Sequence, residues 1–255
     1  MAPARGKSPL FSVEGIRKSV RNLLIFSDIS FEVHEGELLG LVGPSGIARD
    51  ADIDIVDSIL RPDAGVVRFK GEDVTGIKLH KLAAKGLVRT FQKPVVFDDM
   101  TVLDNVVVAH HLDFKLPWWR TVMRNDRDTL RATESACEVL KSLGILPLKD
   151  LKTKDLRYEQ KRTLGIAMAL APRPAMIILD QPPTDLSVNE INLIKGLASE
   201  IKSRDITVLM VGSTLTVLEG TCDRIVSMSA GGSSPTEFSW DDDFVPSHRG
   251  SDSSQ

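Results

Sequence analysis

The feature that most constrains the fold is a short apolar stretch that runs into a glycine-rich turn and then into a helix. The apolar residues, which are typical of a strand, are Val33, Leu38, Leu39, Leu41 and Val42. The turn is Gly43-Pro44-Ser45-Gly46, and the apolar residues after it recur at helical spacing until Arg61-Pro62-Asp63. This order of strand, turn and helix is typical of a phosphate-binding loop in an α/β protein.

Strand and helix patterns alternate along the chain, which predicts a mostly parallel sheet covered by helices. Strands are expected at 66–69, 87–91, 175–179, 206–211 and 224–228, and helices at 53–60, 79–85, 159–170 and 188–203. The segment at about 101–156 is helical with long polar faces, so we expect a helical insertion there. The tail at 233–255 is rich in Ser and acidic residues and has no periodicity, so we expect it to be disordered.

The composition of the 255 residues excludes several classes of protein. The 32 Lys and Arg residues nearly balance the 35 Asp and Glu residues, so we expect no nucleic-acid partner. The two cysteines cannot form a disulfide framework and are expected as reduced thiols. The chain has no apolar run of the roughly 20 residues that a membrane helix needs, and its N-terminus does not resemble a signal peptide. We therefore expect a cytoplasmic protein.

Five segments carry a resemblance to a known family. They are GPSGIARDA (43–51), RTFQKPVVFDDMTVLDNV (89–106), LRYEQKRTLGIAMALA (156–171), MIILDQPPTDLS (176–187) and VLMVGSTLTVLEGTCDRIV (208–226). In this order and spacing they resemble the ATP-binding subunit of an ABC transporter, of the type that imports branched-chain amino acids. The resemblance covers roughly residues 10–230.

The resemblance implies an ABC-type P-loop domain over residues 10–232, with a mostly parallel sheet core, an N-terminal antiparallel β subdomain and the helical insertion. It implies ATP and Mg²⁺ as ligands and membrane-spanning transporter subunits as partners. It also implies a homo- or heterodimer with another ABC ATPase subunit, in which each site combines one subunit's phosphate loop with the other's signature segment. Such a subunit lies on the inner face of the cell membrane.

The loop that would bind the phosphates departs from the family pattern. Its residues are Gly43, Pro44, Ser45, Gly46, Ile47, Ala48, Arg49, Asp50 and Ala51. Ala48 replaces the last glycine, Arg49 the lysine, and Asp50 the hydroxyl residue that holds Mg²⁺. The Asp50 carboxylate would repel a phosphate by on the order of 3 kcal/mol at an effective dielectric of ~20, which would weaken nucleotide binding roughly a hundredfold.

The other family positions are partly kept. Gln92 and Asp180 stand where the Q-loop glutamine and the Walker B aspartate support Mg²⁺. Gln181 replaces the catalytic glutamate, and a neutral amide cannot accept a proton from the attacking water. Ser213 replaces the histidine that contacts the γ-phosphate.

The signature segment is also changed. It comprises Leu156, Arg157, Tyr158, Glu159 and Gln160. Arg157 and Glu159 stand where the family has a serine and a glycine that face the partner's ATP. Because both the loop and the signature are altered, this chain would impair both sites of a dimer, so we expect weakened ATP binding and lost hydrolysis.

Three alternatives remain open at this point. The chain could be a pseudo-ATPase that docks on a membrane subunit or a true ATPase through the helical insertion and the segment after Gln92. It could keep the fold with no remaining role, its motif residues having drifted. It could also retain weak hydrolysis.

Other candidate sites have ordinary explanations. The acidic run at 50–54 begins like a calcium loop, but Ile55 and Arg61 stand where such a loop needs Gly and Glu. His110 and His111 are adjacent and cannot share one helix face. Cys222 has no histidine placed to activate it.

Overall fold

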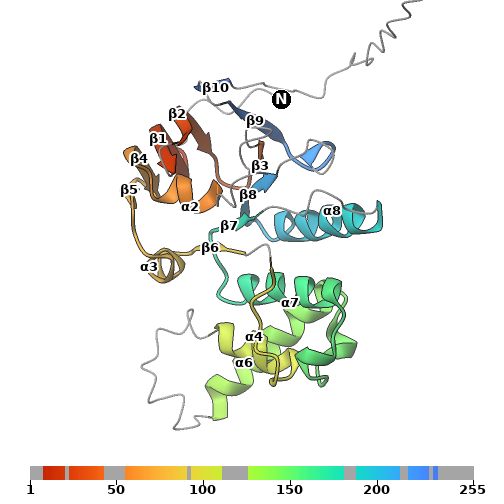
Figure 1. The fold of residues 1–255 in the computed structure, drawn as a ribbon. Coiled ribbons are helices and arrows are strands. Elements are labelled where there is room, and N and C mark those ends of the chain that lie inside the picture. The colour runs from red at the N-terminus through yellow and green to blue at the C-terminus, as the bar shows by residue number, and fades with distance from the viewer. Residues whose placement is uncertain are drawn as a thin grey trace, which may run out of the picture.

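The computed structural model describes residues 8–20, 23–42, 55–90, 93–110, 126–180, 188–212, 218–229 and 232–234. These residues form two sheets and a group of helices (Figure 1). The first sheet is antiparallel, has the order β2-β1-β4-β5, and consists of β1 (Phe11–Val20), β2 (Leu23–Val33), β4 (Ala64–Phe69) and β5 (Glu72–Asp73).

The second sheet has six strands in the order β10-β9-β3-β8-β7-β6. Its strands are β3 (Leu38–Val42), β6 (Leu87–Arg89), β7 (Met176–Leu179), β8 (Thr207–Gly212), β9 (Arg224–Ser229) and β10 (Gly232–Ser234). All neighbouring strands are parallel except β10, which is antiparallel to β9. The predicted α/β fold, with a parallel core and an N-terminal antiparallel sheet, is confirmed.

The six-stranded sheet is covered on both faces. Successive side chains of a strand point to opposite faces, and β7 shows this clearly. Met176 and Ile178 join a core between the two sheets that also contains α2 (Ile55–Leu60). Ile177 and Leu179 join a second core on the other face, which contains residues of the helices at 102–109, 126–142, 158–170 and 188–202. All four residues are buried, as expected for a strand inside a covered parallel sheet.

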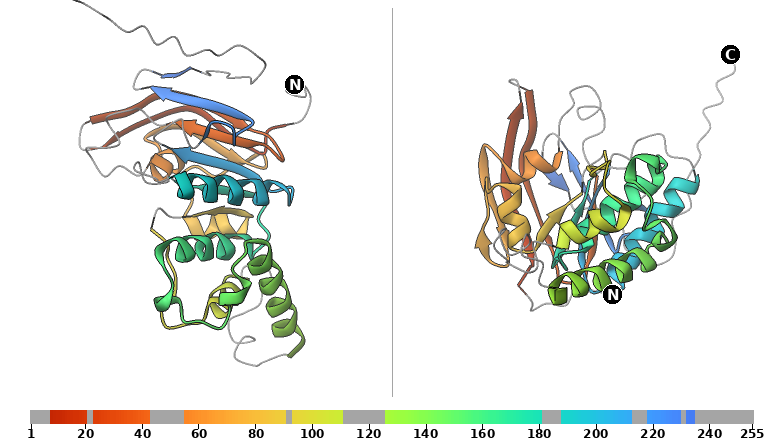
Figure 2. Two further views of the ribbon diagram at one scale, coloured as in Figure 1. Left: turned by 90° about the vertical axis from the view of Figure 1, so that its right-hand side faces the viewer. Right: turned by 90° about the horizontal axis from the view of Figure 1, so that it is seen from below.

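Three helices form a group at the end of the molecule away from the antiparallel sheet (Figures 1 and 2). They are α4 (Val102–Ala109), α6 (Asp126–Ser142) and α7 (Tyr158–Leu170), which pack against one another. The short 3₁₀ helices η2 (Leu146–Leu148) and η3 (Thr153–Asp155) connect α6 to α7. Helix α8 (Val188–Lys202) packs against β8 and α7, and α3 (Leu79–Ala84) precedes β6. No helix in these described ranges is long and apolar enough to cross a membrane.

Two sequence-based expectations are wrong in detail. Val33 does not belong to the strand before the glycine-rich turn but ends β2, because a tight turn at 34–37 separates it from β3. Ser233 and Ser234, expected in the disordered tail, form β10 with Gly232. Their backbone pairs with the free edge of β9, which requires no apolar side chains and so leaves no periodic pattern in the sequence.

Candidate functional site

Four parallel strands end at one edge of the six-stranded sheet. β3 and β8 end side by side at Val42 and Gly212, and the neighbouring pair β6 and β7 ends at Arg89 and Leu179. Each residue predicted to touch nucleotide in this chain's own site follows one of these strand ends in the sequence. In open α/β sheets ligands bind outside the carboxyl ends of the strands, so this edge is the candidate site.

The structure describes only part of the predicted set. The residues outside the described ranges are Gly43, Pro44, Ser45, Gly46, Ile47, Ala48, Arg49, Asp50, Ala51, Gln92, Gln181 and Ser213. Asp180 and the signature segment 156–160 lie within them. The structure therefore shows the side-chain contacts of Asp180 and of the signature residues at the start of α7.

Asp180 forms an ion pair with Arg89. The carboxylate oxygen Oδ2 accepts a hydrogen bond from Arg89 Nε at 3.1 Å and a second from Nη2 of the same guanidinium. Both side chains are only 5 % exposed. A buried charge must be paired, and these two residues meet that requirement within the chain. Sequence reasoning assigned no role to Arg89, although a charged residue that ends an apolar strand calls for a counter-charge.

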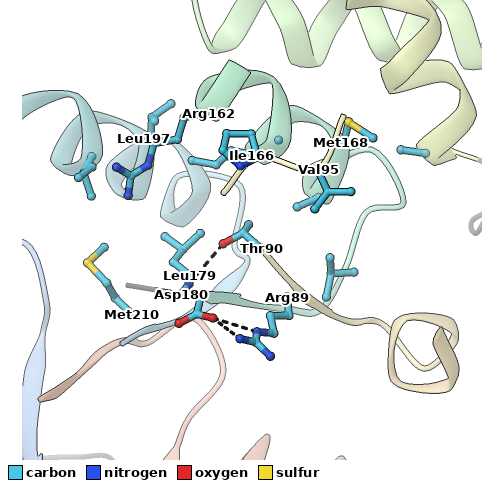
Figure 3. Close-up of a pocket in the computed structure, with 16 residues that line it drawn as sticks. Arg89, Thr90, Val95, Arg162, Ile166, Met168, Leu179, Asp180, Leu197 and Met210 are labelled. Atoms are coloured by element: carbon cyan, nitrogen blue, oxygen red, sulfur yellow. Dashed lines mark hydrogen bonds and ion pairs between the residues drawn. The ribbon is translucent and has the colours of Figure 1, made fainter. Parts of the chain in front are cut away.

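The backbone holds the two partners in place. Arg89 lies opposite Ile178 in the parallel pairing of β6 and β7. Just beyond the strands, the Thr90 N–H donates to Ile178 O at 2.9 Å, and the Asp180 N–H donates to the Thr90 hydroxyl at 3.3 Å. Thr90 thus joins the end of β6 to the backbone of Ile178 and Asp180. Figure 3 shows the contacts of Asp180 with Arg89 and Thr90.

A cavity of about 240 Å³ lies beside the ion pair, between this part of the sheet and helices α7 and α8. Most of its wall is apolar, with Ile166, Leu179 and Met210 among the lining residues (Figure 3). Its charged lining residues are Arg89, Arg162 and Asp180. None of the signature residues 156–160 lines it.

The signature segment lies at the start of α7 and presents bulky side chains. Leu156 is buried, whereas Arg157, Tyr158 and Glu159 are exposed. The side-chain Oε1 of Gln160 accepts a hydrogen bond from the Arg157 N–H at 2.9 Å, which caps the helix in the way that a glutamine at the third helical position can. Glu159 in the first turn is favourable for the helix dipole, but its carboxylate would repel a phosphate.

The segment between β6 and α4 is held by Asn105. Its Nδ2 donates to Phe97 O at 3.1 Å, to Thr101 O at 2.9 Å and to Thr153 Oγ1 at 3.0 Å, and its Oδ1 accepts from the Phe97 N–H at 2.8 Å. Val95 and Phe97 of this segment nevertheless expose 67 % and 50 % of their surfaces. The backbone of the segment is therefore held at Phe97 and Thr101. Its exposed side chains are mixed: Val95, Phe97 and Met100 are apolar, and Lys93, Asp98 and Asp99 are charged. Asn105 was not predicted, although a polar residue on the helix face shared with Val102 and Val106 is a detectable signal.

The remaining candidates give no additional site. His110 is buried at the end of α4. Cys222 is also buried, and burial raises the pKa of its thiol to about 12, which makes it a poor nucleophile. Within the ranges that the structure describes, no group of three or more His, Cys, Asp or Glu side chains could hold a metal ion.

Comparison with known families matches residues 26–184, more than half of the chain, to the ABC transporter model. The high-affinity branched-chain amino acid transport ATP-binding protein BraF of Pseudomonas aeruginosa is 29 % identical over 233 residues, which cover 88 % of this chain and 89 % of that protein. The lipopolysaccharide export system ATP-binding protein LptB of Acidithiobacillus ferridurans is 30 % identical over 217 residues, which cover 85 % of each chain.

Solved structures show the same fold. The ADP conformation of an ATP-binding cassette of an ABC transporter is 25 % identical, with a TM-score of 0.72, and the match covers 89 % of this chain and 90 % of that one. The cbiO1 subunit from Clostridium perfringens has the same TM-score at 22 % identity, and the match covers 89 % of this chain and 88 % of that one.

Proposed function

Because this chain belongs to the ABC transporter family of ATP-binding domains, we propose that it is the ATP-binding subunit of a branched-chain amino acid importer whose nucleotide binding is weakened and whose hydrolysis is lost. The relatives named for branched-chain amino acid transport support the assignment of the solute class. As in the family, the subunit would lie on the inner face of the membrane, against membrane-spanning subunits, and pair with a second ABC subunit.

One observation carries the proposed loss of hydrolysis: the scaffold of the site is intact while the residues attached to it are changed. The four strands that end at the site pair in regular parallel register. The positions that follow three of them in the sequence carry Arg49 and Asp50, Gln181, and Ser213. An aspartate in the loop opposes phosphate, and a glutamine cannot serve as a general base.

The start of α7 supports the same conclusion for the second site of a dimer. A partner's γ-phosphate would have to approach the first turn of this helix, where Tyr158 is 46 % exposed between Arg157 and Glu159. These side chains occupy space that serine and glycine would leave open, and Glu159 adds a negative charge. The residues present therefore do not fit a partner's ATP.

Nucleotide binding and turnover of the purified full chain test this proposal. We expect calorimetric titration with Mg-ATP to give an affinity about a hundredfold below that of the variant Arg49→Lys/Asp50→Thr. We expect no ATP turnover by the native chain, alone or with its membrane subunits. Asp57→Asn is the matched control, because it removes a carboxylate from α2 outside the loop. Turnover by the native chain that Asp180→Asn abolishes would contradict the proposal.

Repair of the motifs tests whether the scaffold still supports chemistry. The variant combines Arg49→Lys, Asp50→Thr, Gln181→Glu and Ser213→His with Arg157→Ser and Glu159→Gly in the signature. We expect turnover to appear only when both groups of changes are present, because each dimer site combines a loop with a signature. Failure of the complete variant to hydrolyse ATP would place the defect elsewhere than these positions.

A second function, that of a non-catalytic structural or regulatory partner, is favoured by the exposed apolar segment after β6. Val95, Phe97 and Met100 are exposed, and Asn105 holds the backbone at Phe97. The exposed carboxylates of Asp98 and Asp99 lie between Phe97 and Met100 in the sequence. A rigid apolar surface is suited to docking on another protein.

Co-purification with co-expressed transporter membrane subunits in the absence of nucleotide tests this second function. We expect Val95→Ser/Phe97→Ser to abolish the complex and Leu130→Ser, which changes a similarly exposed side chain on α6, to leave it intact. A complex that forms only with ATP, or that survives the double substitution, would contradict this function.

A further inference from the structure

The Arg89–Asp180 ion pair lies where the family's Walker B aspartate supports Mg²⁺. Asp180 directly follows β7, and Arg89 is the last residue of β6. The guanidinium directs two nitrogen atoms, Nε and Nη2, at the same carboxylate oxygen, Oδ2. Both side chains are almost fully buried, so bulk water does not compete for them.

The positive charge of Arg89 in this pair is permanent. An arginine side chain does not lose its proton in proteins, so the guanidinium is positive at every accessible pH. The Asp180 carboxylate is therefore neutralised from within the chain without any bound ion. Its partner is also fixed in position, because Arg89 is part of the β6–β7 pairing and the next residue, Thr90, hydrogen bonds to the backbone of Ile178 and of Asp180.

The surroundings are unfavourable for a divalent cation. Mg²⁺ requires nearly octahedral oxygen coordination and keeps several water molecules, which in turn need polar partners. The cavity beside Asp180 is mostly apolar, and its charged lining residues are two arginines and this one aspartate. A cation placed there would face the guanidinium of Arg89 at the same oxygen, Oδ2. With the Arg89 guanidinium bound to Asp180, the described residues at this aspartate therefore do not fit Mg²⁺.

We propose that Arg89 is a built-in cation that takes the place of Mg²⁺ at Asp180, so that this chain binds no divalent cation through that aspartate. Asp180 then serves to join β6 to β7 rather than to support a metal. The inference deepens the proposed loss of hydrolysis and rests on that function for its biological meaning. Its test uses no nucleotide, so the two proposals can fail independently.

Binding of Mn²⁺, followed by electron paramagnetic resonance on the full chain without nucleotide, tests the inference. We expect the native chain and Asp180→Asn to bind Mn²⁺ equally at millimolar concentration, with no site that depends on Asp180. We expect Arg89→Gln to gain one bound Mn²⁺ per chain and Arg89→Gln/Asp180→Asn to lose it again. Arg89→Lys is the matched control, because it keeps the positive charge and should gain no Mn²⁺ site.

Two results would overturn the inference. One is a Mn²⁺ site in the native chain that Asp180→Asn removes. The other is an Arg89→Gln chain that remains folded, as judged by circular dichroism, yet gains no Mn²⁺ site. If Arg89→Gln does not fold, the unfolding temperature of the native chain, measured with and without Mg²⁺, tests the inference instead. A ligand that binds the folded state raises the unfolding temperature, so an increase that Asp180→Asn abolishes would overturn the inference, and no increase would support it.

Discussion

The side chain of Asn105 donates a hydrogen bond of 3.0 Å to the hydroxyl of Thr153, and both residues are completely buried. This contact joins α4 to η3 across 48 positions of sequence. The same amide holds the backbone of Phe97 and Thr101. A single asparagine thus fixes the exposed apolar segment relative to the helices that lead to the signature.

We expect Asn105→Ala to lower the free energy of unfolding by about 3 kcal/mol, because it removes the four hydrogen bonds of a completely buried amide, including the one that the Phe97 N–H donates. Asn192→Ala is the matched control: Asn192 is exposed on α8, and its loss should change stability by less than about 0.5 kcal/mol. Urea denaturation of both variants provides the measurement. Equal stability of the two would show that the buried amide contributes nothing specific.

Close packing at Gly40 leads to a second prediction. A Cβ added there would lie 3.0 Å from Cys222 Sγ, 3.2 Å from Ile225 Cγ1 and 3.3 Å from Leu218 Cδ1. We expect Gly40→Ala to destabilise the chain by about 1–3 kcal/mol through overpacking beneath β3. Added Cys222→Ala should recover part of this loss, because it removes the closest atom.

The control for this experiment is Gly196→Ala. Apart from its chain neighbours and the backbone of α8 itself, nothing lies within 4 Å of a Cβ added at Gly196, so alanine should stabilise the helix by about 0.5–1 kcal/mol. Opposite signs for the two glycine substitutions in chemical denaturation are the expected result. A stabilising Gly40→Ala would mean that the residues around β3 rearrange freely.

The parallel core could be predicted from the sequence because its strands are buried on both faces and read as continuous apolar runs. The run from Met176 to Leu179 is an example. β10 could not be predicted, since the sequence Gly232-Ser233-Ser234 has no apolar pattern and its strand is defined by backbone pairing with β9. β10 forms because the edge of β9 that faces away from β3 has no other strand beside it in the six-stranded sheet, and this edge exists only in the assembled sheet.

The candidate site was predicted only in part for a similar reason. The resemblance identified Asp180, but not that its charge is met by Arg89, which lies 91 positions earlier. This pairing follows from the register of β6 against β7, which local sequence does not encode. Asn105 also acquires its role only when η3 brings Thr153 beside α4. Contacts between distant segments are the part of the site that the sequence alone did not supply.

The thiol of Cys222 provides a prediction about pH. Burial and, to a lesser extent, the neighbouring Asp223 carboxylate raise its pKa from an ordinary 9.0 to about 12. The protonated thiol is therefore favoured by folding, and its contribution to stability is fully present below pH 9 and is lost as the pH rises toward 12. The native thiolate population at pH 8 should be about a thousandfold below that of the unfolded chain.

We expect Cys222 in a Cys137→Ser background to react with a disulfide reagent at pH 8 only as fast as the chain unfolds, and rapidly in guanidinium. The free energy of unfolding should fall more steeply between pH 8 and pH 10 for Cys137→Ser than for Cys137→Ser/Cys222→Ala. Only the former has the Cys222 thiol, which loses its proton when the chain unfolds. Rapid reaction of the native thiol would contradict its burial beside β3. The same reagent then becomes a reporter of opening at Gly40, since the Cys222 sulfur packs directly against that glycine.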